Sequence, residues 1–130
     1  MAYTSDMKAA ARRLSTAAEQ LHAQPNHRAV AAYLIGLAAE CALKFVASSL
    51  PGGNSEAIQG EHLPRLRTAL RELQLGRRQQ ALKRLIDSDA FMNEWKIDIR
   101  YARNQDIHNK PTDRWRTDAV SAVNLMEGWA

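Results

Sequence analysis

The stretch AAYLIGLAAECALK, residues 31 to 44, decides the fold class of this 130-residue chain. Apolar residues stand on almost every side of a helix built from it, and the pattern runs from about Arg28 to Leu50. A helix that is apolar nearly all round is either a membrane span or the central member of a bundle. The run is short for a span, and Glu40 and Lys44 interrupt it. We therefore expect a core helix, with Glu40 and Lys44 paired one turn apart.

The residues on either side of this stretch predict further helices around it. Apolar residues recur at spacings of three and four from Met7 to Leu21, after a start signal at Ser5 and Asp6. Pro25 then separates this first helix from the core helix. The segment from Pro51 to Gly60 is rich in Gly, Pro, Asn and Ser, so we expect an exposed loop there.

Three more segments complete the expected fold. A third, short helix ends at Gly76, and a fourth stops near Ser88. Between Phe91 and Ile99 the pattern favours a helix end that runs into an extended segment. A final helix starts at Pro111, with Thr112 as its cap. Because no strand pair is indicated, we predict an all-α, up-and-down helical bundle of about five helices.

The composition is that of an ordinary globular domain. Hydrophobic residues make up 45% and charged residues 25%, so we expect a single domain over residues 1–130. The single Cys41 can form no internal disulfide, and the N-terminus lacks the apolar centre of a secretory signal. A cytoplasmic protein without membrane association fits best. Of the 18 basic residues 13 are Arg, and the net charge of +4 suits a phosphate-bearing partner such as RNA.

Residues 103–108, RNQDIH, carry the candidate catalytic chemistry. Cleaving RNA without a metal requires a base for the 2′-hydroxyl, an acid for the leaving oxygen and positive charge on the phosphate. His108 can serve as base or acid, Arg103 can clamp phosphate through two hydrogen bonds, and Asn104 can orient either of them. Since one chain provides one such set, a symmetric homodimer would assemble the composite site. The alternative is that Arg103 and His108 hold a loop against the end of the bundle.

Further basic residues are candidates for contacts with nucleic acid. Arg77 and Arg78 lie at a helix start, where the helix dipole disfavours cations, and Arg100 and Lys110 flank the RNQDIH segment. His62 is a second candidate site residue, although a His that closes a turn is more common. No set of His, Cys and carboxylate residues has zinc-site spacing, and no Gly-rich phosphate loop occurs. We therefore predict neither a metal nor a cofactor.

Two segments resemble a known family. The run Tyr-Leu-x-Gly-x-x-x-Glu-Cys-Ala-Leu-Lys, residues 33–44, and WKIDIRYA, residues 95–102, resemble the HEPN domains of prokaryotes, over roughly residues 28 to 128. The resemblance implies a helical bundle, usually dimeric and often encoded beside a small nucleotidyltransferase. Many HEPN domains are metal-independent endoribonucleases whose motif is Arg, an adjacent polar residue and a His four to six residues beyond the Arg. Arg103, Asn104 and His108 match that motif.

The resemblance leaves more than one function open. The first is a metal-independent endoribonuclease, toxin-like in kind, that acts on RNA as a homodimer. The second is a non-catalytic HEPN module that binds a nucleotidyltransferase partner or nucleic acid. It stays open because Lys110 stands where the toxin branch has Tyr, and because the pair Arg100 and Tyr101 marks a branch that often lacks a working motif. The third possible function is that of a helical assembly domain that serves only to form a dimer.

Overall fold

The computed structural model describes residues 5–129, in which the regular structure is helical and no strand occurs. The all-α prediction is confirmed. Seven α-helices replace the expected five or so, because two four-residue helices lie in segments where no helix was expected. In chain order the α-helices are α1 (Met7–His22), α2 (Arg28–Ser48), α3 (Glu56–Gln59), α4 (Arg65–Arg71), α5 (Gln80–Asp87), α6 (Asn104–Ile107) and α7 (Thr112–Glu127).

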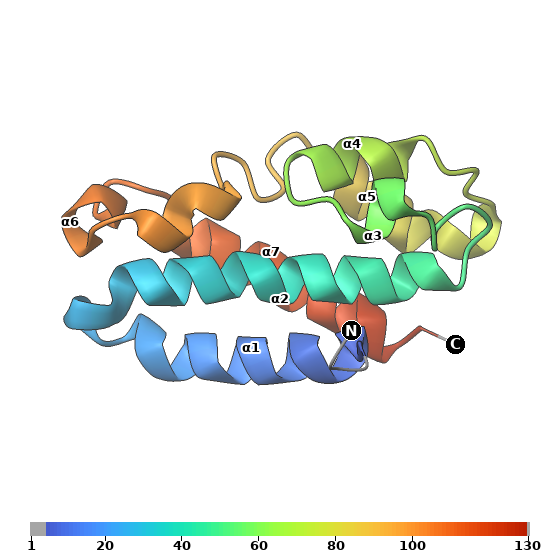
Figure 1. Cartoon of the computed structure of the whole chain (residues 1–130). Helices are drawn as coiled ribbons and strands as arrows, with labels where there is room; N and C mark the ends of the chain where they lie inside the picture. Colours follow the sequence, from blue (N-terminus) through green and yellow to red (C-terminus); the bar gives the residue numbers. More distant parts are fainter. Residues whose placement is uncertain (1–4, 130) are drawn as a thin grey trace.

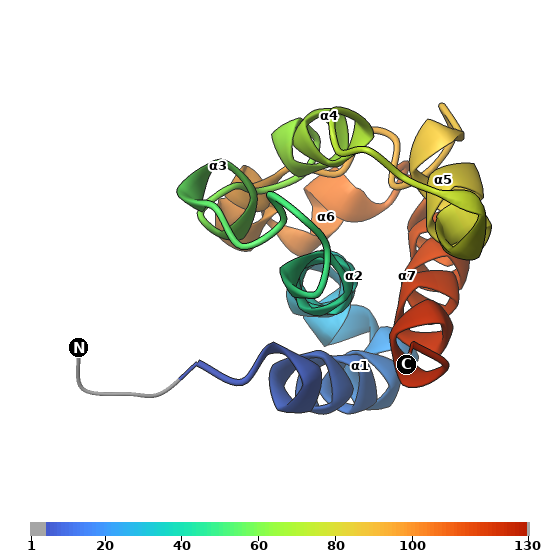
Figure 2. The same ribbon diagram turned by 90° about the vertical axis from the view of Figure 1, so that its right-hand side faces the viewer.

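Helix α2 runs through the centre, as its sequence predicts. Figures 1 and 2 show α1 along one side of it, α7 along another, and the short helices α3, α4 and α6 across a third. Most of α2 is buried, and many of the buried residues are Ala, which allows the neighbouring helices to approach closely. At Gly36 a side chain would overlap the indole ring of Trp95, whose Nε1 donates to the carbonyl of Ala32 at 2.9 Å.

One stripe of α2 nevertheless remains half-exposed, although the all-round apolar pattern predicted a fully covered helix. Val30 is 48% exposed, and further residues on the same face are only partly buried: Leu34, Leu37, Cys41 and Phe45. Their spacing of three and four residues keeps them on one side of the helix. On this face of α2 the rest of the protomer therefore covers the apolar side chains only in part.

The predicted ion pair between Glu40 and Lys44 is wrong. Glu40 is 2% exposed, and its carboxylate accepts from the backbone N–H of Leu63 at 2.8 Å and contacts Nδ1 of His62 at 2.9 Å. A buried carboxylate is stabilised more by such fixed donors than by a flexible ammonium group one turn away. His62 thus closes its turn onto α2, which is the more common of the two roles considered for it.

The segment from Phe91 to Ile99 is not extended. It forms turns and then a 3₁₀ helix, η3 (Ile97–Tyr101), because no neighbouring strand is available to pair its backbone. Turn hydrogen bonds replace that pairing, such as Ile99 N–H to the carbonyl of Lys96 at 3.1 Å. Other boundaries also differ: Thr112 is the first residue of α7 and makes no side-chain cap bond, and α4 ends at Arg71 rather than near Gly76.

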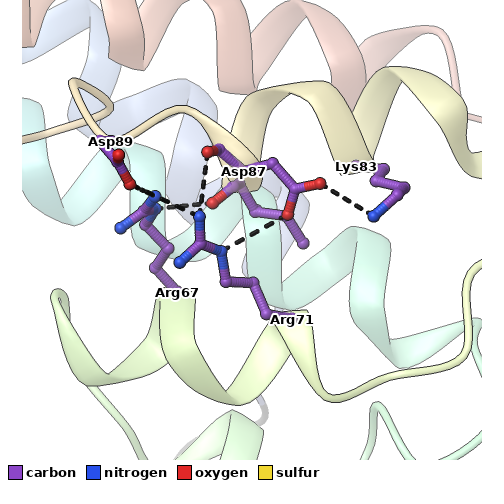
Figure 3. A network of polar contacts seen from close by, with 6 residues as sticks. Arg67, Arg71, Lys83, Asp87 and Asp89 are labelled. Carbon is purple, nitrogen blue, oxygen red and sulfur yellow. Dashed lines mark hydrogen bonds and ion pairs between the residues drawn. The ribbon is translucent and has the colours of Figure 1, made fainter.

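A network of charged side chains joins α4 to the end of α5 (Figure 3). Nε of Arg67 donates to the carbonyl of Ile86 at 2.6 Å, and Nη2 of Arg71 donates to that of Asp87 at 2.9 Å. These carbonyls lie at the C-terminus of α5, where the helix dipole favours cations. Arg67 and Arg71 therefore stabilise the packing of α4 against α5.

The chain segment Pro25–Ser48 is long and apolar enough to cross a membrane by length and composition, with a mean hydropathy of 1.7 in its most apolar window. Inside the fold, however, 67% of that window is buried. Within the protomer this segment therefore serves as the core helix.

Candidate functional site at the α6 turn

The RNQDIH segment forms α6 and the residues beside it, and Asn104 anchors it to the start of α2. The side-chain Oδ1 of Asn104 accepts from the N–H of Ala29 at 3.0 Å, and Nδ2 donates to the carbonyl of Asn26 at 2.8 Å. The first N–H groups of a helix lack partners within it, so Asn104 supplies one from 75 residues away. Ile107, which is 3% exposed, holds the other side of the turn in the core.

Arg103 stands directly before α6 with an exposed side chain. Its guanidinium lies against Asp106, with 3.3 Å between Nε and Oδ2, and its backbone N–H donates to the same oxygen. The hydrogen bonds from the side chain and backbone of Arg103 lower the pKa of Asp106. Because the Arg103 side chain is 74% exposed, a phosphate can displace Asp106 at little cost.

His108 follows α6 and is exposed, and its ring makes no hydrogen bond to any residue that the structure describes. It lies five residues after Arg103, whose backbone is extended with a ψ of 154°, so the two residues flank opposite ends of the four-residue α6. Arg103 pairs with Asp106, and no hydrogen bond joins it to His108 within the protomer.

The structure adds neighbours that the sequence did not associate with RNQDIH. The 3₁₀ helix η1 (Pro25–His27) packs against α6 through Asn104, so His27 and Arg28, both exposed, lie at the same end of the bundle. His22 is close by at the end of α1, where Nε2 lies 3.4 Å from Oδ1 of Asp113. No local pattern could reveal this grouping, because the contact joins residues 78 positions apart.

Arg100 and Lys110, predicted to contact nucleic acid, flank the turn as expected. The guanidinium of Arg100 lies 4.9 Å from the ring centre of Tyr101, which is 77% exposed. An exposed aromatic ring beside a guanidinium is a suitable surface for stacking an unpaired base. Lys110 is partly neutralised, since its Nζ lies 3.6 Å from Oε1 of Glu94.

Arg77 and Arg78 lie far from this site, within the 3₁₀ helix η2 (Arg77–Gln79) that leads into α5. Arg78 lines a hollow of about 380 Å³ with Leu50 and Trp129, beyond the C-terminal end of α2. Asn104 contacts the opposite end of α2, and a helix of 21 residues is about 30 Å long. The sequence-predicted basic residues therefore form two separate groups, which cannot contact the same phosphate within one protomer.

Among residues 5–129 no group of three or more His, Cys, Asp or Glu side chains is arranged to hold a metal ion. Comparison of the chain with family models, with curated proteins and with solved structures gives no match. The resemblance to HEPN domains rests on the sequence segments quoted above.

Proposed function

We propose that the protein is a cytoplasmic, HEPN-like endoribonuclease that acts on RNA as a homodimer, with the α6 turns of two copies forming the site. The observation that carries this proposal is the anchored turn. Asn104 and Ile107 fix its backbone, while Arg103 and His108 stay exposed at its two ends. A fixed backbone with exposed reactive groups is what a preorganised site requires.

The proposed chemistry assigns one role to each side chain. His108 of one copy takes the proton of the 2′-hydroxyl, whose oxygen attacks the adjacent phosphorus. The bond from phosphorus to the 5′-oxygen breaks, and that oxygen receives a proton from His108 of the second copy, leaving a 2′,3′-cyclic phosphate. Arg103 exchanges Asp106 for the phosphate and stabilises its growing charge through a forked hydrogen-bond pair. Asn104 acts as a positioning residue, since both ends of its amide are bound to backbone groups.

The half-exposed stripe of α2 supports the homodimer. It combines Val30, Leu34 and Leu37 near the N-terminal end of α2 with Cys41 and Phe45 farther along. Apolar residues at alternating spacings of three and four form the seam through which two helices pack. Val30 directly follows Ala29, to which Asn104 binds, so this seam begins beside the α6 turn.

The test is cleavage of a mixed RNA substrate in EDTA by the purified protein and by two pairs of variants. His108→Ala should abolish cleavage, whereas His62→Gln, at a His on another surface, should leave it measurable. Arg103→Ala should reduce the rate about 100-fold or more, as expected for loss of a transition-state contact. Its control is Arg65→Ala, which removes an exposed Arg on α4. Full activity in His108→Ala would refute the proposal.

The second candidate is a non-catalytic HEPN module that binds a nucleotidyltransferase partner or nucleic acid. The observation that favours it is the pairing of Arg103 with Asp106, together with the lack of a hydrogen bond between Arg103 and His108 within the protomer. In that case the protein leaves RNA intact, and it binds single-stranded RNA with the same affinity in wild type and His108→Ala. A nucleotidyltransferase gene should then lie next to that of this protein, and co-expression of the two should give a stable complex.

A further inference from the structure

A groove of about 720 Å³ lies between α5 and α7, on surfaces that the proposed RNA chemistry does not use. Figure 2 shows these two helices side by side at one edge of the molecule. The volume falls within the range of small-molecule sites, roughly 300–1,000 Å³. The groove therefore has room for a small ligand.

Each helix contributes one face to the groove. On α5 this face includes Arg84 and Leu85, and on α7 it includes Arg114 and Leu125. The buried ring of Phe91 completes the apolar part. The hydroxyl groups of Ser88 and Ser121 also line the groove, whereas that of Thr117 donates to the carbonyl of Asp113 at 3.1 Å. The lining thus combines two cations, several hydrogen-bonding groups and an apolar surface.

Arg114 is held in place by a buried acid. Asp118 is 6% exposed, and its Oδ1 accepts from Nε of Arg114 at 3.1 Å, while its Oδ2 accepts from the backbone N–H of Met92 at 2.8 Å. Both carboxylate oxygens are therefore occupied. The two terminal nitrogens of Arg114 form no hydrogen bond to any residue that the structure describes, and they are the pair that can bind an oxyanion in a forked geometry.

Arg84 has no acid partner among the described residues, because the acids near it are bound elsewhere. Figure 3 shows the reason: Asp87 pairs with Lys83 of its own helix at 2.9 Å and with Arg71 of α4 at 3.4 Å. Asp89 likewise pairs with Arg67 at 3.1 Å. One positive charge of the groove is balanced by Asp118, so the two guanidiniums leave a net charge of about +1 for a ligand to neutralise.

We propose that this groove binds a small organic phosphate, with its phosphate between Arg84 and Arg114 and its apolar part against Leu85, Phe91 and Leu125. The two guanidiniums and the hydroxyls of Ser88 and Ser121 offer more donors than the two oxygens of a carboxylate can accept. A phosphate monoester carries up to two charges and three terminal oxygens, which matches this set. The proposal is independent of RNA cleavage at the α6 turn.

The test is a ¹H–¹⁵N NMR titration of the full-length protein with phenyl phosphate, inorganic phosphate and phenol. Phenyl phosphate should cause saturable shifts in residues 81–91 and 114–125, and it should bind more tightly than either fragment. Arg84→Gln should weaken its binding about tenfold, which corresponds to about 1.4 kcal/mol. The matched control Lys83→Gln removes the same charge from the other face of α5, and it should change the affinity less than about twofold.

Three results would overturn the proposal. The first is an absence of saturable shifts in the groove at millimolar phenyl phosphate. The second is equal weakening by Arg84→Gln and Lys83→Gln, which would indicate diffuse attraction to a basic surface. The third is a set of shifts centred on α6 instead of the groove. Thermal unfolding of each variant verifies its fold, and because both replaced side chains are exposed, neither change should alter the unfolding temperature appreciably.

Discussion

Replacing Asn104 with Ala tests the anchoring of the α6 turn directly. The change removes two hydrogen bonds, one from the N–H of Ala29 at 3.0 Å and one to the carbonyl of Asn26 at 2.8 Å. Loss of a side-chain acceptor at a helix N-terminus costs about 1 kcal/mol, and a second hydrogen bond contributes about 1 kcal/mol more. We expect the free energy of unfolding to fall by about 2 kcal/mol and the melting temperature by about 6–10 °C in a chain of this length.

Urea denaturation gives the free energy, and amide hydrogen exchange at Ala29 reports the local bond. Asn104→Asp keeps the acceptor for Ala29 but loses the donor to Asn26, so it should recover about half of the lost stability. Gln105→Ala, at an exposed neighbour without a hydrogen bond to any described residue, should change stability by less than about 0.5 kcal/mol. Equal stability of Asn104→Ala and Gln105→Ala would refute the anchoring argument.

The Asn104→Ala variant also separates the positioning of the α6 turn from the chemistry of the side chains that it carries. Asn104→Ala retains both Arg103 and His108, yet the turn that carries them is released from α2. If the protein cleaves RNA, the rate should therefore fall well below that of wild type under conditions in which the variant is fully folded. A variant that is destabilised but fully active would show that Asn104 serves the fold alone.

Three further changes probe the fold, the dimer and the surface charges. Gly36→Ala should destabilise the protein by about 1–3 kcal/mol in urea denaturation, because the new methyl group overlaps the indole of Trp95; at an ordinary helix position the same change would stabilise it by up to about 1 kcal/mol. Leu34→Glu should convert a dimer into a helical monomer, and light scattering that still detected a dimer would exclude the α2 stripe as its interface. The hydrogen bond from Arg12 lowers the pKa of Glu127, so this pair stabilises the fold above the unfolded-state pKa and ceases to do so as pH falls through the lowered value. Glu127→Gln should thus show a smaller loss of melting temperature between about pH 5 and pH 3 than wild type, and equal losses would contradict this.

The long helices were predictable because their apolar periodicity is local. Helix α2 begins at Arg28 as expected and ends at Ser48, two residues before the expected end, and α1 spans the expected residues. Helices α3 and α6 were missed because four residues are too few to show a period. Such short helices persist through tertiary contacts, as the two hydrogen bonds of Asn104 illustrate.

The sequence indicates the residues of the candidate site but not their arrangement. The motif Arg103, Asn104 and His108 follows from the resemblance to HEPN domains. The arrangement depends on contacts between distant parts of the chain. These contacts bind Asn104 to the start of α2, bring His27 next to it, and place Arg77 at the other end of the bundle. Similarly, Glu40 was paired with the nearest cation in sequence, whereas the fold brings it His62 and a backbone N–H.

The geometry of α2 also restricts which dimer could be catalytic. Suppose that two antiparallel copies of α2 pack along the half-exposed stripe. If the two-fold axis passes near Leu37, eight residues from Ala29, each α6 turn lies about 12 Å from the axis, and the two turns are separated by about 24 Å. Acid and base must both reach one phosphate within hydrogen-bonding distance, so such a dimer would be inactive. Only an axis within about one helical turn of Val30 places Arg103 and His108 of both copies around a single phosphate, and dimer formation by itself is therefore not evidence of activity.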